Sequence, residues 1–177
     1  MIYESDKHRR RTPRLKGYDY SSDGAYFVTI CTYNRECTLG DIINGEMRLN
    51  EYGNIVKTVW HGLTHHYKYM ELDEFVIMPN HIHGIIILQD AVGAGFKPAP
   101  TIKHHGLTEI VRGFKTFSSR SINQRHNTPG THVWQRNYHE HVIRDEADLH
   151  RIRKYIVNNP LQWDMDSENP ENIGQRR

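Results

Sequence analysis

Residues 49–67 constrain the fold most strongly, because their apolar side chains recur mostly at steps of three and four. This spacing predicts an amphipathic helix that buries one stripe of its surface. Residues 25–33 precede the helix and are rich in β-branched and aromatic side chains, as expected of a buried strand. Residues 75–78 and 81–88 follow it and have the same strand-like character. Strands on both sides of a helix predict a mixed α and β domain.

Two short turn signals divide this first half of the chain further. Asn44-Gly45 is the preferred pair for a type I′ turn, so residues 39–49 are expected to form a hairpin. Pro79-Asn80 predicts a second turn, which joins two consecutive strands. Strands that follow one another directly are expected to pair in an antiparallel sheet.

The second half continues the alternation. Apolar spacing predicts a helix from residue 107 to about 121, and residues 131–143 are expected to form a strand. Asp145 is a suitable N-cap for a third helix, which Pro160 would end. The complete order predicts an α+β fold of the ferredoxin-like or RRM-like type, with an antiparallel sheet and helices packed mainly on one face.

The length of 177 residues suits one domain. We expect that domain to cover residues 1–163, with a basic arm at about 1–20 and a loop insertion at about 89–106, where periodicity is lost. Residues 164–177 are polar and are expected to form a poorly ordered tail. Neither a secretory signal nor an apolar run of membrane-spanning length is evident, and two cysteines make no disulfide framework. These features predict a cytoplasmic protein without membrane contact.

The net charge of +2 conceals two basic segments. Residues 7–16 contain no acid and are either a frayed, solvated terminus or an arm that docks on phosphates. Residues 110–139 also lack acids and interleave cations with aromatic rings, which suits single-stranded nucleic acid. A solvated helix face above an aromatic core is the alternative for this segment. The candidate DNA-binding residues are Arg9, Arg10, Arg11, Arg14, Arg112, Lys115, Arg120 and Arg136.

His81 and His83 begin a predicted strand, where residues two apart point to the same face. Two imidazoles side by side make half of a metal site, while Ile82 points to the other face. The alternative is a pair of polar residues on a solvated sheet face. The chain has 13 histidines, and His139 and His141 repeat the same spacing, so the pair alone does not decide between these interpretations.

Tyr155 and Asn159 lie four residues apart on the third predicted helix, so their side chains share one helical face. The tyrosine hydroxyl could therefore face solvent or a cleft. An amphipathic tyrosine at the edge of the core is the simpler explanation of this residue alone.

These motifs together resemble a known family. The run Met-Pro-Asn-His-Ile-His-Gly at residues 78–84 closely resembles the His-hydrophobic-His motif of single-strand-specific tyrosine transposases. Residues 133–141 and 155–160 are similar to the C-terminal half of the same family. Arg14-Leu15 and residues 26–30 resemble its REP-associated branch. The resemblance covers roughly residues 9–163.

The resemblance implies a function for each candidate residue. His81 and His83 would bind a divalent metal, Mg²⁺ or Mn²⁺, and Asn159 would complete the site, where many insertion-sequence relatives carry glutamine. Tyr155 would be the nucleophile that cuts single-stranded DNA beside a hairpin and forms a 5′-phosphotyrosine. Strand transfer would follow, and the basic segments would bind the hairpin. The family implies a ferredoxin-like fold and either a monomer or a homodimer.

Two other functions fit parts of the sequence. An RRM-like nucleic-acid-binding module without catalysis would share the sheet, the aromatic residues and the basic charges. A zinc hydrolase could use His81, His83, His139 and His141, but no glutamate base stands at a defined spacing from them.

Overall fold

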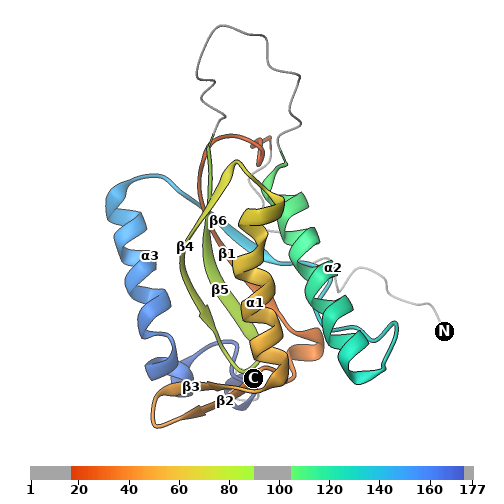
Figure 1. The fold of residues 1–177 in the computed structure, drawn as a ribbon. Coiled ribbons are helices and arrows are strands. Elements are labelled where there is room, and N and C mark those ends of the chain that lie inside the picture. Colours follow the sequence, from red (N-terminus) through yellow and green to blue (C-terminus); the bar gives the residue numbers. More distant parts are fainter. Residues whose placement is uncertain (1–16, 90–104, 174–177) are drawn as a thin grey trace, which may run out of the picture.

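The computed structural model describes residues 17–89 and 105–173. Four antiparallel strands form the central sheet in the order β4-β5-β1-β6 (Figure 1). Their bounds are β1 Gly24–Cys31, β4 Met70–Ile77, β5 His81–Leu88 and β6 His139–Ile143. This strand order, with one helix after β1 and one after β5, is the ferredoxin-like plan, which confirms the predicted fold class.

Most of the predicted arm and nearly all of the loop at 89–106 lie outside the described residues. The candidate DNA-binding residues Arg9, Arg10, Arg11 and Arg14 also lie outside the described residues.

The helices α1 (Glu51–His66) and α2 (Leu107–His126) cover one face of the sheet, and α3 (Glu146–Asn158) covers the other (Figure 1). The first helix lies within the predicted residues 49–67, and it begins at Glu51 because the Asn50 side chain accepts a hydrogen bond from the Gly53 amide. The second runs about five residues beyond the expected end. It stops at Asn127, whose left-handed backbone (φ 53°) forms a C-cap.

The hairpin prediction is confirmed by β2 (Gly40–Ile43) and β3 (Glu46–Leu49). Asn44 and Gly45 join these strands with φ values of 55° and 76°. Positive φ at both central positions is the requirement of a type I′ turn. A short 3₁₀ turn, η2 (Tyr33–Arg35), links β1 to the hairpin.

The prediction of a strand over residues 131–143 is wrong for its first eight residues, since only His139–Ile143 pairs with β1 as β6. Trp134 makes an isolated bridge with Thr32 instead, and its indole N–H donates to Ser118. Lys115 fixes the residues that follow Trp134, because its ammonium donates to the carbonyls of Gln135 and Asn137. These partners come from distant parts of the chain, so the local pattern could not reveal them.

The predicted tail is also wrong for residues 164–173. Asp145 caps α3 as expected, but Pro160 starts a 3₁₀ helix, η3 (Pro160–Met165), and a short helix follows, α4 (Pro170–Ile173). Asp166 and Asn169 are buried. The segment after α3 therefore folds back onto the sheet. Among the described helices, none is long and apolar enough to span a membrane.

Candidate active site

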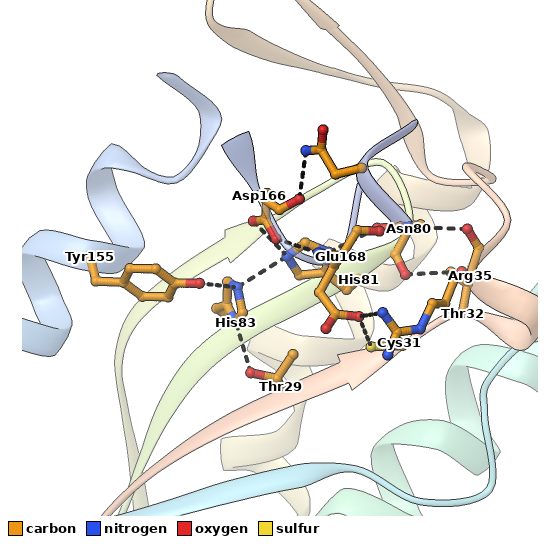
Figure 2. A network of polar contacts seen from close by, with 11 residues as sticks. Thr29, Cys31, Thr32, Arg35, Asn80, His81, His83, Tyr155, Asp166 and Glu168 are labelled. Carbon is orange, nitrogen blue, oxygen red and sulfur yellow. Dashed lines mark hydrogen bonds and ion pairs between the residues drawn. The ribbon is translucent and has the colours of Figure 1, made fainter. Parts of the chain in front are cut away.

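The two predicted metal ligands lie together at the start of β5, on the face that α3 covers. His81 and His83 are 0% and 3% exposed, and their Nε2 atoms are 3.0 Å apart. Figure 2 shows Tyr155 reaching His83 from one side and Asp166 lying beside His81, while the Glu168 carboxylate points to Arg35 and Cys31. The solvated-face alternative for this pair is therefore excluded.

Each imidazole is oriented by a hydrogen bond to its other ring nitrogen. His81 Nδ1 lies 2.8 Å from Asn80 Oδ1, and His83 Nδ1 lies 2.9 Å from Thr29 Oγ1. The Asn80 amide nitrogen donates to the carbonyls of Arg35 and Glu168, which directs its oxygen toward His81. An amide oxygen only accepts, so His81 carries its proton on Nδ1 and keeps the Nε2 lone pair available.

Burial keeps both histidines neutral. It lowers the pKa of His81 to about 3 and the pKa of His83 well below its ordinary value. A neutral imidazole is the form that binds a cation. The pair is therefore already in its ligating state at neutral pH.

Asp166 joins these histidines, although nothing in the sequence pattern indicated it. Its Oδ2 lies 3.9 Å from His81 Nε2, and one ligand atom from each of the three residues falls within 4.8 Å of the others. The Glu168 amide donates to its Oδ1, which fixes the carboxylate. The 3₁₀ turn after Pro160 brings Asp166 to the site, so a local sequence signal is absent.

Asn159, the predicted third ligand, stands at the C-terminal end of α3. The residue is buried, and its side-chain oxygen has no hydrogen-bond partner among the described residues. A buried amide oxygen without a partner costs about 1–3 kcal/mol. Such an acceptor suits a cation, so its state is consistent with the predicted role.

The Tyr155 hydroxyl lies 3.3 Å from His83 Nε2, and the side chain remains 41% exposed. Its ring also meets Phe27 edge-on at 6.1 Å between centroids. Burial raises the pKa of Tyr155, and the charge of Asp166 raises it further, whereas a hydrogen bond from Asn159 lowers it. The phenol is therefore protonated at neutral pH and needs assistance to act as a nucleophile.

A cavity of about 560 Å³ opens beside these residues. The sheet contributes Thr29, His83 and His139 to its walls, and α3 contributes Arg151 and Tyr155. Ser167 and Glu168 close it from the C-terminal segment. The cavity gives a substrate access to the exposed side of Tyr155.

The remaining candidate histidines do not join the cluster. His139 is exposed, and His141 Nε2 lies 2.7 Å from Asp148 Oδ2. Among the described residues, the metal-ligating group contains His81 and His83 with Asp166 in place of this second pair. The four-histidine zinc arrangement is therefore not formed.

Three of the basic candidates, Arg112 and Lys115 on α2 and Arg136 after it, lie around a second depression. Arg112 and Arg136 are exposed there, next to Lys115 and Tyr138, and Arg120 is exposed elsewhere on α2. Burial lowers the pKa of Lys115 to about 8, and its ammonium is hydrogen bonded to protein carbonyls. The two arginines are therefore better placed for phosphates than the lysine.

The chain is similar to several known proteins. The family model described as "Transposase IS200 like" matches residues 97–159, which include Tyr155 and Asn159. An uncharacterized protein of Haemophilus influenzae is 44% identical over 173 residues, which are 93% of this chain and 95% of that protein. A candidate REP-associated tyrosine transposase of the same organism is 26% identical over 81% of this chain and 74% of its own length. Residues 97–159 therefore resemble the IS200-like transposase family. A solved REP-associated tyrosine transposase bound to a REP hairpin shares the fold of this chain, with a TM-score of 0.59 and 20% identity over 82% of this chain and 71% of that one.

Proposed function

We propose that this protein is a transposase, a metal-dependent single-stranded DNA endonuclease and strand-transferase that acts through a 5′-phosphotyrosine on hairpin-forming repeat DNA. One observation supports it above all. The hydroxyl of Tyr155 stands 3.3 Å from His83 Nε2, beside a second buried imidazole and a buried carboxylate. A half-exposed phenol next to a cation site is what phosphoryl transfer to tyrosine requires.

The donor set fits a divalent cation. Neighbouring ligands that each lie about 2.1 Å from an octahedral ion are separated by about 3.0 Å, and the two Nε2 atoms are 3.0 Å apart. His81 and His83 would hold the ion with oxygens from Asp166 and Asn159, and Mg²⁺ or Mn²⁺ suits this mixture of nitrogen and oxygen. The bound ion would supply positive charge to the phosphate.

The chain's own residues account for the rest of the reaction. The oxygen of Tyr155 forms a bond to phosphorus, and the bond from phosphorus to the 3′-oxygen of the preceding nucleotide breaks. The phenolic proton leaves to solvent through the open cavity, and the 3′-oxygen takes up a proton. The products are a 5′-phosphotyrosine and a free 3′-hydroxyl, so a second DNA end can be joined by reversal without ATP.

A solved protein of the same fold is bound to a REP hairpin, which supports hairpin DNA as the partner. We propose that Arg112, Arg120 and Arg136 contact phosphates of such a hairpin, together with Arg9, Arg10, Arg11 and Arg14 of the N-terminal segment and Lys115. The protein would act in the cytoplasm, as a monomer or a homodimer. A non-catalytic RRM-like binding module would share the fold, but it would not need Tyr155 beside buried ligands.

The test is covalent capture. Labelled single-stranded DNA, carrying a hairpin from the flank of the gene, is incubated with protein and Mn²⁺ or Mg²⁺, and then resolved under denaturing conditions. The wild type should form a DNA-linked band that EDTA abolishes. Tyr155→Phe should lose this band and keep hairpin binding, whereas Tyr33→Phe, at another exposed tyrosine, should keep both. Hairpin binding without a band in the wild type would favour the binding module.

A further inference from the structure

The helix that carries Tyr155 is held to the sheet by polar contacts at two opposite edges. Arg153 donates two hydrogen bonds to Asp73 of β4, at 2.8 and 2.5 Å. Nearer its start, Asp148 of the same helix lies 2.7 Å from His141 of β6. Since β4 and β6 are the two edge strands, these contacts reach both sides of the sheet.

Asp73 lies at a bulge in β4, and it follows Leu72, which packs on the α1 side, so it points to the α3 side. Leu72 pairs with Ile86 and Phe75 with Gly84, so two residues of β4 oppose the single Ile85 of β5. In a regular strand, residues three apart such as Leu72 and Phe75 would point to opposite faces. The bulge lets both pack against the core under α1, and Val76 packs on the α3 side. Bulges often redirect a side chain next to an active site.

The apolar contact beneath α3 is small. The polar contacts at the two edges therefore do much to determine how α3 is oriented on the sheet. Ile152 and Ile156 of the helix pack on Phe27, Ile85 and Ile143. Apolar packing of this kind is not directional. A two-pronged contact between a guanidinium and a carboxylate has a fixed geometry and so limits rotation of the helix about its axis.

We propose that Asp73 and Arg153 are positioning residues for the nucleophile. They set the rotation of α3 that brings the Tyr155 hydroxyl to His83, with the Asp148–His141 contact fixing the other end. This inference rests on the proposed function, because it takes Tyr155 to be the attacking group. A displacement of about 1 Å in a reacting group can cost about 100-fold in rate.

The experiment measures single-turnover formation of the covalent DNA adduct, hairpin affinity and amide hydrogen exchange. Asp73→Asn and Arg153→Gln should each slow adduct formation by about 10-fold or more, while hairpin affinity stays within about twofold. Exchange should become faster in α3 and stay unchanged in α1. The matched control is Glu74→Gln, which removes the neighbouring charge of the same bulge and should leave the rate unchanged.

A reversed pair separates positioning from general damage. Asp73→Arg combined with Arg153→Asp should regain at least a third of the rate lost in the single variants. Wild-type rates in both single variants would overturn the proposal, as would equal acceleration of exchange in α1 and α3 or a double variant no faster than the singles.

Hydrogen exchange does not depend on catalysis, so the proposed function can fail separately. If the wild type formed no adduct, or if Tyr155→Phe still formed one, the assignment of the nucleophile would fall. The loosening of α3 in the variants would still be measured.

Discussion

The two faces of the sheet differ in how they use their side chains. Under α1 and α2 the core is apolar and closed, with Tyr26, Trp60 and Phe114 among its fully buried residues. Under α3 the apolar cluster has five buried members, and beside it lie two buried histidines and an open cavity. The first face contributes most of the apolar burial that stabilises the fold. The second face buries polar side chains, which costs stability but forms the candidate site.

The largest expected loss of stability comes from the closed face. Phe114 lies between Trp60 and Trp134, with ring centroids 5.4 Å from each. Phe114→Ala should lower the free energy of unfolding by about 3–5 kcal/mol, measured by urea denaturation. The rate of adduct formation by the folded fraction should change less than twofold. A large loss of that rate at low temperature would show that the faces are coupled.

A side chain truncated on the other face should cost less stability than Phe114→Ala but slow adduct formation more. Ile152 is buried between α3 and the sheet, so Ile152→Ala should cost about 2–3 kcal/mol. Because Ile152 belongs to the helix that carries Tyr155, adduct formation should slow more than in Phe114→Ala. Single-turnover rates of both variants, compared at a temperature where both are folded, check this. Equal rates would contradict the division between the faces.

Gly84 tests how tightly the closed face is packed. A Cβ at this position would lie 2.4 Å from Trp60 Cζ2, and Trp60 stacks on Phe75 at 4.5 Å between centroids. Gly84→Ala should therefore cost about 1–3 kcal/mol through overpacking. Thermal unfolding measures the loss. Unchanged stability would mean that Trp60 can move to make room for the added methyl group, which would contradict tight packing of this face.

The smallest effect concerns the contact that joins α3 to β4. The Arg153 guanidinium holds the pKa of Asp73 below its ordinary value, so ionised Asp73 favours the folded state. That stability is present above the unfolded pKa of about 3.9 and is lost as the pH falls through the lower folded value. Asp73→Asn should cost up to about 1 kcal/mol at pH 7. Urea denaturation across pH should show the difference shrinking below about pH 4, and a constant difference would contradict it.

Much of the fold could be predicted because its signals are local. The spacing of residues 49–67, the Asn44-Gly45 pair and the Asp145 cap each specify a structure within a few residues. The strand predicted over 131–143 is wrong only before His139, because Trp134 is held by Thr32 and Ser118, which are remote in the sequence. Periodicity cannot report such contacts.

The residues of the candidate site also divide into those with a local sequence signal and one without. His81 and His83 were found from strand geometry, and Tyr155 and Asn159 from helical spacing, with the family resemblance assigning their roles. Asp166 was missed because a chain reversal after Pro160 carries it to the histidines. An acidic residue in a polar segment has no pattern that separates it from a solvated tail.

The central claim is that the open face performs its chemistry through Tyr155. The most direct measurement is proteolysis of the covalent DNA adduct, formed by the wild type in Mn²⁺, followed by mass spectrometry of the nucleotide-bearing peptide. We predict a phosphodiester on Tyr155, joined to the 5′ end of the downstream strand. A nucleotide on any other residue, or attachment through a 3′ phosphate, would contradict the account.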